Sequence, residues 1–162
     1  GWRMGFAVGN DILIAALEKI KSYLDYGAFT PIQVAAASAL SSDPITIEKV
    51  RGVYRNRRDV LVDAMGKAGW NIPSPEATMF AWAPIPEKFR PLGSLEFSKV
   101  LLKEADISVA PGIGFGEYGE NFVRIGLVEN EHRIRQASRN IKSVFNKADK
   151  ILSEYSLDQI DM

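Results

Sequence analysis

A long predicted helix divides this sequence into two unlike parts. Asp43 can cap the helix, and Pro44 fits its first position because the missing backbone N–H costs nothing there. Gly69 can end the helix in a left-handed conformation. The pattern therefore predicts a helix over residues 44–68, with apolar residues at close to helical spacing: Ile47, Val50, Tyr54, Leu61, Ala64 and Met65.

The other faces of this predicted helix are basic. Long charged side chains on a helix usually remain in water while their stems cover neighbouring surface. We therefore expect the arginines to form a solvated side of the helix: Arg51, Arg55, Arg57 and Arg58.

The part before the long helix does not form a complete unit by itself. Residues 4–8 are predicted as a short buried strand, and Asp11 can cap a helix that runs to about Tyr23. Pro31 opens a helix of small residues over 34–40, whose alanines suggest close backbone approach to another element. The opening is apolar and rich in glycine, as expected of a chain that begins inside a structure. Residues 1–43 thus resemble the remnant of a second domain.

The part after the long helix predicts a small α+β layer. Strands are expected over residues 77–83, 107–110 and 122–128. Ser94 should cap a helix to about Ala105, and a last helix is expected from Asn130 to about Tyr155, with a frayed polar tail after Ser156. The first of these helices should bury Phe97, Leu101 and Leu102. This order of elements indicates helices packed on one face of a small mixed sheet, within a domain of residues 69–162.

Composition removes several classes of function. The 162 residues hold no cysteine, which excludes disulfides, zinc–thiolate sites and a cysteine nucleophile. They hold one histidine, which gives little support to a Ser-His-Asp triad or a multi-histidine metal site. Twenty basic side chains balance twenty acidic ones, which argues against a general binder of nucleic acid or membrane surfaces. We find no signal peptide and no apolar run long enough to span a bilayer, so a cytoplasmic location is expected. The lone histidine, His132, is expected at the surface.

An arginine lies in the middle of the strand predicted over residues 122–128. Val123, Ile125 and Leu127 share one apolar face of the strand, so Arg124 must point to the other, beside Gly126. Burying an unpaired guanidinium costs several kcal/mol, so this side chain is either exposed or paired. From the strand alone, the partner could be protein or ligand.

The glycine-rich stretch PGIGFGEYG, residues 111–119, precedes this strand. It does not follow a strand and open a helix as a dinucleotide-binding G-x-G-x-x-G does, and it lacks the Lys-Ser/Thr of a P-loop. It could be a long surface connection. Its glycines would also let the backbone approach a small ligand closely.

Four stretches in order resemble class I/II pyridoxal-phosphate aminotransferases of fold type I, the aspartate aminotransferase superfamily. GWRMGFAVG is similar to the segment after the cofactor lysine, and SSDPITIEKVRGVYRNRRDVLVDAM to the interdomain helix. PSPEATMFAWAPIP resembles the family's Pro-x-Gly strand, although Ala77 replaces the usual glycine. VAPGIGFGEYGENFVRIGLVENEHRIRQA resembles the Pro-Gly-x-x-Phe-Gly … Val-Arg-Ile signature. The resemblance implies the C-terminal part of such an enzyme, with residues 1–43 left from the large cofactor-binding domain.

The resemblance also assigns roles to residues. Arg124 matches the arginine that binds the α-carboxylate of the substrate, and Arg3 matches the arginine that binds the cofactor phosphate. Thr30 lies in a loop that reaches the neighbouring active site in this family, and we assign it to cofactor binding too. The Schiff-base lysine of the family lies before Gly1, so no catalytic residue is expected in this chain and the isolated segment should be inactive.

The partners implied are an amino acid, a 2-oxo acid, pyridoxal 5'-phosphate in the complete protein, and a second copy in a homodimer. The residues of the motifs are most similar to those of the alanine, aspartate and diaminopimelate aminotransferases within this family. Three alternatives remain: a C–S lyase or cyclopropane-carboxylate synthase on the same scaffold, the effector domain of a transcription regulator, or an interaction module. We also expect self-association to cover the apolar surface along residues 4–40.

Overall fold

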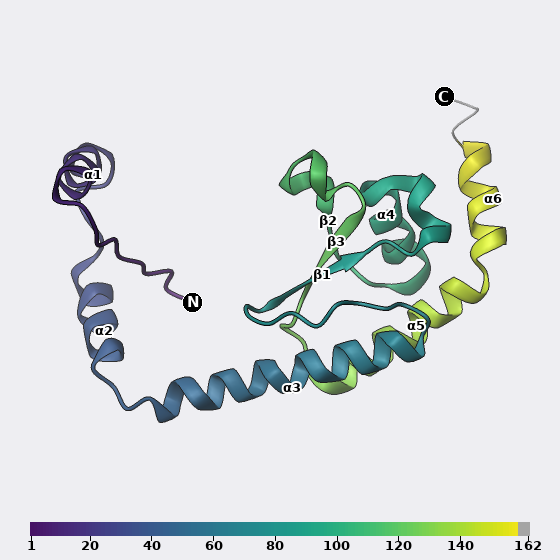
Figure 1. Ribbon diagram of the computed structural model, residues 1–162, viewed down its shortest axis with the longest axis horizontal. Coiled ribbons are helices and arrows are strands. Elements are labelled where there is room, and N and C mark those ends of the chain that lie inside the picture. Colours follow the sequence, from purple (N-terminus) through teal and green to yellow (C-terminus); the bar gives the residue numbers. More distant parts are fainter. Residues whose placement is uncertain (159–162) are drawn as a thin grey trace. The chain divides into compact units, whose positions relative to one another are not determined.

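The computed structural model describes residues 1–158. The chain divides into two compact units: unit 1 is Gly1–Glu48, and unit 2 begins at Lys49 (Figure 1). We describe each unit by itself. Within the described residues, no helix is both long and apolar enough to cross a membrane.

Unit 1 contains helices α1 (Asp11–Leu24) and α2 (Thr30–Leu40). The side-chain oxygen of Asn10 accepts hydrogen bonds from the backbone N–H groups of Ile12 and Leu13, so Asn10 caps α1. The prediction that Asp11 is the cap is therefore wrong by one residue. Asp11 is instead the first helical residue, where its negative charge suits the helix dipole.

Residues 4–8 do not form the predicted buried strand. They carry no strand pairing, and Phe6 is 74% exposed. A strand needs a neighbour for its backbone groups and cover for its side chains, and residues 1–48 supply neither. Nowhere in residues 1–48 is a side chain fully buried.

The long helix is confirmed as α3 (Ile45–Lys67). The Asp43 carboxylate accepts a hydrogen bond from the Ile45 backbone N–H at 2.9 Å, which provides the predicted cap. At the other end Gly69 has φ of +91°, the left-handed conformation expected of it. The last two turns of α3 contribute Leu61 and Met65 to the core of unit 2.

Unit 2 holds a three-stranded sheet of β1 (Phe80–Pro84), β3 (Phe122–Gly126) and β2 (Ala110–Pro111), in that order. Both neighbours of β3 run antiparallel to it, so the prediction of a mixed sheet is wrong. β1 starts three residues later than predicted because Thr78 has φ of +72°, which interrupts the extended backbone. β2 is shorter and later than the strand predicted over residues 107–110.

The predicted C-terminal helix is two helices, α5 (Glu131–Asn146) and α6 (Ala148–Asp158). They separate at Lys147, and Ala148 and Ile151 are then buried near a short 3-10 helix, η1 (Glu87–Leu92). The chain therefore bends where α6 packs against the rest of unit 2. Of the tail predicted to fray after Ser156, Leu157 and Asp158 belong to α6, and residues 159–162 lie outside the described residues.

Helix α4 (Gly93–Ala105) covers the inner face of the sheet. Phe97 and Leu101 are fully buried as predicted, but Leu102 is 57% exposed, because it lies on the outer side of the helix. Ser94 lies inside the first turn rather than at the cap position. On the sheet, the residues that face this helix layer have no exposed surface: Ala81, Ala83 and Val123.

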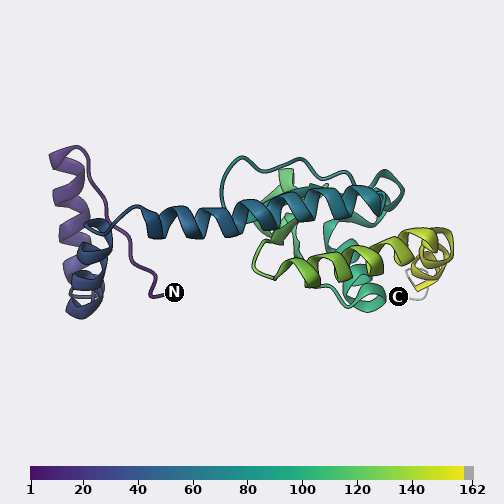
Figure 2. The same cartoon turned by 90° about the horizontal axis from the view of Figure 1, so that it is seen from below.

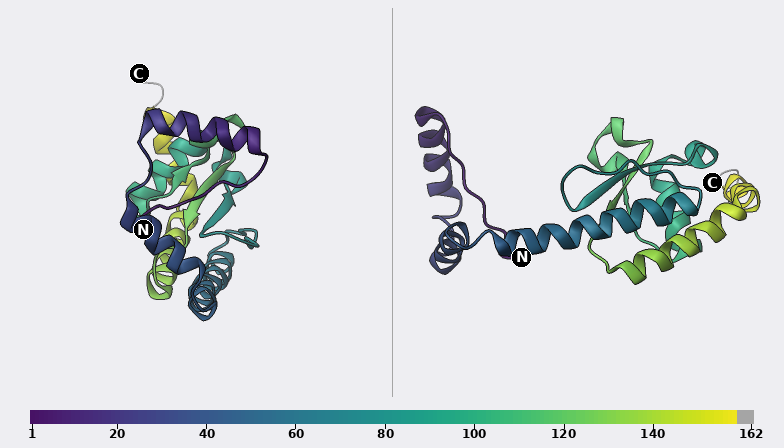
Figure 3. Two further views of the ribbon diagram at one scale, coloured as in Figure 1. Left: turned by 90° about the vertical axis from the view of Figure 1, so that its left-hand side faces the viewer. Right: turned by 60° about the horizontal axis from the view of Figure 1, so that its bottom comes forward.

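Helices α3 and α5 lie side by side in unit 2 and run in the same direction (Figures 2 and 3). The Ser138 hydroxyl donates to the Ala64 carbonyl at 2.7 Å, and the Asn56 amide donates to the Glu131 carboxylate at 2.7 Å. Together with α4 they enclose an aromatic core of Trp70, Phe89, Phe97 and Phe145, in which the Trp70 Nε1–H donates to the Pro84 carbonyl.

Candidate carboxylate-binding site

Arg124 lies at the centre of the sheet, on the face opposite the core. Its backbone is aligned with Trp82 of β1 and with Ala110 of β2. The preceding residue, Val123, is completely buried, whereas the Arg124 side chain is half-buried. The alternation predicted from the sequence is thus the arrangement that β3 adopts.

The guanidinium of Arg124 has no carboxylate partner among residues 1–158. Its contacts are aromatic: its central carbon is 4.2 Å from the centre of the Phe80 ring and 4.4 Å from the centre of the Phe115 ring. Such cation–π contacts stabilise a cation without using its N–H groups. Arg124 therefore keeps hydrogen-bond donors free in a partly dry environment.

The two rings belong to a larger aromatic group on this face. Trp82 stacks on Phe122 with 5.6 Å between ring centres, and it makes a T-shaped contact with Phe115 at the same distance. Phe80, Trp82 and Phe115 each retain more than a third of their surface. These rings surround the cation with apolar surface, which strengthens its attraction to an incoming anion.

The glycine-rich stretch folds into two short 3-10 turns, η2 (Gly112–Phe115) and η3 (Glu117–Gly119). A Cβ atom on Gly112 would overlap the carbonyl oxygens of Gly119 and Phe122, and one on Gly119 would overlap Gly112. These two glycines thus allow the loop to cross itself. Gly114, by contrast, has open space around it.

A polar network fastens this loop to the start of α4. The Glu120 carboxylate accepts hydrogen bonds from the Ser94 hydroxyl at 2.8 Å and from the Ser94 backbone N–H at 3.2 Å. A third hydrogen bond runs from the Ile113 backbone N–H to the Ser94 hydroxyl oxygen, at 3.0 Å. Ser94 is fully buried, so the network anchors the turn that carries Phe115.

Arg57 is a structural residue that the sequence analysis missed. It was expected on a solvated side of α3, but its guanidinium donates to the carbonyls of Leu127 and Val128 at 3.1 and 3.0 Å. These bonds hold the chain just beyond β3. Its spacing from Tyr54 and from buried Leu61 places it on the inner side of the helix, which is the signal that could have found it.

Glu131 supports the same region at the start of α5. Its own backbone N–H and the Asn56 amide donate to its carboxylate and hold the pKa of Glu131 below its usual range. Its neighbour His132 is exposed, as expected, and lies in the first turn of the same helix.

A groove of about 670 Å³ lies in unit 2 between α3 and the segment that leads into β1. Phe80, whose ring contacts Arg124, also lines this groove. The charged residues of its wall are Glu76 and three arginines of α3, of which Arg58 pairs with Asp59: Arg51, Arg55 and Arg58.

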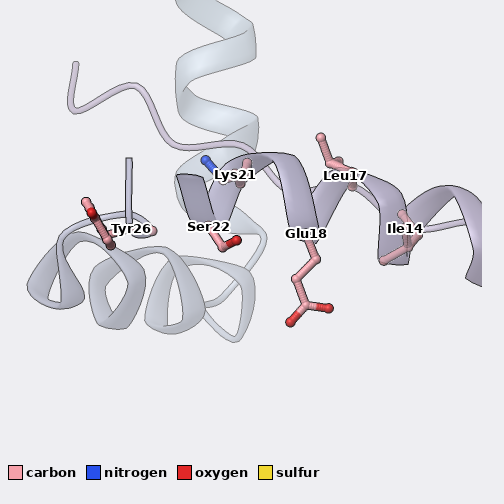
Figure 4. A pocket seen from close by; sticks show the side chains of 8 residues that line it. Ile14, Leu17, Glu18, Lys21, Ser22 and Tyr26 are labelled. Carbon is pink, nitrogen blue, oxygen red and sulfur yellow. The ribbon is translucent and has the colours of Figure 1, made fainter. Parts of the chain in front are cut away.

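The other two candidate ligands lie in unit 1. Arg3 is exposed and has φ of +58°, and Thr30 is the exposed first residue of α2. Neither lines the shallow hollow of about 400 Å³ beside α1 (Figure 4), which is formed by Ala7, Ile14, Leu17, Glu18, Lys21, Ser22, Tyr26 and Gly27. Arg3 and Thr30 thus belong to unit 1, whereas Arg124 belongs to unit 2. The described residues contain no group of three or more His, Cys, Asp or Glu side chains that could hold a metal ion.

Residues 1–141 match the family model described as aminotransferase class I and II. The chain belongs to this family. It is 67% identical over 152 residues to the putative aminotransferase AatC of Rhizobium meliloti (strain 1021), covering 94% of this chain and 38% of the relative. It is 54% identical over 152 residues to the glutamate-pyruvate aminotransferase AlaC of Escherichia coli (strain K12), covering 94% and 37%.

Solved structures also resemble this chain. The aromatic aminotransferase from Pyrococcus horikoshii OT3 superposes with a TM-score of 0.83 at 29% identity, covering 91% of this chain and 40% of that one. Substrate-bound BacF from Bacillus subtilis gives a TM-score of 0.82 at 36% identity, covering 88% and 36%. Enzymes of this family use pyridoxal 5'-phosphate, as the resemblance implied. The chain spans less than two fifths of the length of the curated relatives described above.

Proposed function

We propose that the chain is the C-terminal part of a pyridoxal-phosphate-dependent aminotransferase, and that Arg124 binds the α-carboxylate of its substrates. The complete enzyme would move an amino group between an amino acid and a 2-oxo acid. The observation that carries the proposal is the Arg124 guanidinium, which lies on a paired strand against two rings and has no acidic partner among the described residues.

The geometry of the side chain suits this role. A guanidinium is planar and can donate two parallel hydrogen bonds to a carboxylate, which fixes the orientation as well as the position of the ligand. A substrate held in this way has its Cα–H bond aligned for proton transfer, a positioning effect on the reaction rate. The sheet keeps the Arg124 backbone in place between β1 and β2.

We assign the phosphate of the cofactor to Arg3. Arg3 is exposed and has no ion pair within residues 1–158, so its guanidinium is free to bind a phosphate group. We assign Thr30 to the same cofactor site, across the dimer. When bound, pyridoxal 5'-phosphate supplies the electron sink for the chemistry at the substrate Cα.

The remaining parts of the proposal concern the whole protein. We infer a large-domain portion at residues 1–43, an interdomain helix at 44–68 and a small domain at 69–162. We also infer a cytoplasmic homodimer, and no transaminase activity for the isolated chain. The 54% identity to the AlaC protein, whose name gives glutamate and pyruvate, makes these two compounds the first substrate pair to test.

The test replaces Arg124 in the complete protein that carries this segment. Each charge-assisted hydrogen bond contributes about 1.5–3 kcal/mol, so Arg124→Gln should weaken glutamate binding by roughly a hundredfold or more. Arg133→Gln is the matched control, because Arg133 is exposed on α5 and, within residues 1–158, its side chain donates a hydrogen bond to Gln136 and to no carboxylate. Unchanged glutamate affinity in Arg124→Gln would overturn the proposal.

A further inference from the structure

We propose that Phe80 and Phe115 form a clamp that holds the Arg124 guanidinium in the orientation needed to receive a carboxylate. Phe115 is then a positioning residue, acting on the substrate through Arg124. This inference rests on the proposed function, because it concerns the same carboxylate. It adds two residues to which neither the sequence analysis nor the resemblance gave a role.

The two rings reach the cation from different parts of the sheet. Phe80 belongs to β1, and Phe115 ends the turn η2 that follows β2. Because β3 lies between β1 and β2, one ring comes from the strand on one side of Arg124, and the other comes from the turn that follows the strand on its other side. The guanidinium lies 4.2 and 4.4 Å from the two ring centres, close enough for both rings to restrict its rotation.

A guanidinium held between two rings can be approached by a ligand from fewer directions than a free one. Its donors all lie in the plane of the group, and aromatic contacts occupy the space above or below that plane. A carboxylate must therefore approach along the plane, which is the approach that gives two parallel hydrogen bonds. The clamp also removes side-chain freedom before the ligand arrives, so less ordering is needed on binding.

The clamp is itself held in place. Phe115 lies within the crossed loop that Gly112 and Gly119 permit, and the Ile113 backbone N–H ties this loop to Ser94. Trp82 of β1 makes a T-shaped contact with the Phe115 ring. The Phe115 side chain is exposed, and exposed side chains are usually mobile. The loop, its hydrogen bonds to Ser94 and the contact with Trp82 therefore restrict its movement.

The decisive experiment separates aromatic character from bulk in the complete protein loaded with cofactor. Phe115→Leu keeps an apolar side chain but removes the ring, and Phe115→Tyr keeps the ring. We expect the dissociation constant for L-glutamate to rise about tenfold in Phe115→Leu and to stay within about twofold in Phe115→Tyr. The cofactor affinity and the melting temperature should be unchanged in both. Tyr118→Leu, on the same loop and 90% exposed, is the control and should have no effect.

A second set of variants keeps the proposal falsifiable if Phe115→Leu does not fold. Phe80→Leu removes the other ring and should also weaken glutamate binding. In an Arg124→Gln background neither leucine substitution should weaken it further, because the clamp acts only through Arg124. Three outcomes would contradict the clamp. The leucine variants could bind L-glutamate as tightly as the unchanged protein, or their affinity for the cofactor could fall together with their affinity for glutamate. The leucine substitutions could also weaken glutamate binding in the Arg124→Gln background. If Arg124→Gln itself has no effect, the proposed function fails instead.

Discussion

Unit 1 and unit 2 both carry amphipathic helices, but only unit 2 buries their apolar faces. Leu17 and Ile20 of α1 are three residues apart, and Phe97 and Leu101 of α4 are four apart, so each pair lies on one face of its helix. Leu17 is 41% and Ile20 57% exposed, whereas Phe97 and Leu101 have no exposed surface. The difference lies in what surrounds each helix. α4 packs on a sheet and on α5, whereas nothing within residues 1–48 covers α1 to that extent.

A helical pattern in the sequence identifies the apolar face of a helix but does not identify the surface that covers it. An apolar stripe favours a helix that packs against something, and the stripe of α1 predicts that cover as clearly as the stripe of α4 does. The stability of unit 2 should therefore come from its own core, whereas unit 1 should depend on other surfaces. The self-association expected from the sequence stays a prediction.

The largest expected difference between the units concerns their tryptophans. Trp70 is 2% exposed, contacts Phe97 and Phe145, and donates to Pro84, whereas Trp2 is 80% exposed. Trp70→Ala should lower the free energy of unfolding of unit 2 by about 3–5 kcal/mol, and Trp2→Ala should change it by less than about 0.5 kcal/mol. Denaturant unfolding followed by circular dichroism measures both. Equal effects would mean that the exposure contrast between the units does not describe the protein in solution.

The next effect tests the crossed loop of unit 2. Gly112→Ala places a methyl group against the carbonyls of Gly119 and Phe122, and should destabilise unit 2 by about 1–3 kcal/mol. Gly114→Ala, in the same turn but with open space around it, should be nearly neutral. Thermal unfolding of the two variants compares them directly. If Gly112→Ala leaves the melting temperature unchanged, Gly112 lies further from the backbone of Gly119 and Phe122 than in this structure.

A smaller effect is expected in unit 1. The Asn10 side chain satisfies the N–H groups of Ile12 and Leu13, so Asn10→Ala should destabilise α1 by about 1 kcal/mol. Because α1 lacks a core to compensate, the loss should appear as reduced helicity of unit 1 by NMR chemical shifts, with unit 2 unchanged. Asn10→Asp, which keeps the capping oxygen, should retain the helix. Loss of helicity in unit 2 would contradict the independence of the two units.

Local signals predicted much of this fold. The cap at Asp43, the left-handed Gly69 and the alternation around Arg124 each depend on residues close in sequence, and each is present. The features that were missed depend on residues far apart. Arg57 bonds to carbonyls 70 and 71 residues away, and Glu120 bonds to Ser94 across 26 residues.

The candidate site shows the same limit. The sequence placed Arg124 on the open face of its strand, but the rings that contact it come from β1 and from the turn after β2. Exposed phenylalanines show no periodicity that would mark them as neighbours of one arginine. The break at Lys147 was also hidden, because the apolar stripe continues through it and only the packing of α6 near η1 requires the bend.

The smallest effect compares one carboxyl group from each unit. A hydrogen bond from Lys21, followed by one from the Gly27 backbone N–H, lowers the pKa of Asp25 in unit 1. The pKa of Glu131 in unit 2 is lowered chiefly by its own backbone N–H and the uncharged Asn56 amide. Lys21→Gln should raise the first pKa and Asn56→Ala the second, both measured by NMR titration.

Salt should distinguish the two carboxyl groups. Mobile ions screen an exposed charge pair more than they weaken hydrogen bonds from neutral donors, so 1 M salt should raise the pKa of Asp25 more than that of Glu131. Because both values are depressed in the folded state, each group stabilises its unit at pH above the ordinary carboxyl range, and this contribution disappears as the pH falls through the folded value. Equal salt responses would mean that Asp25 owes its shift to the backbone rather than to Lys21, and the contrast in electrostatics between the two units would then disappear.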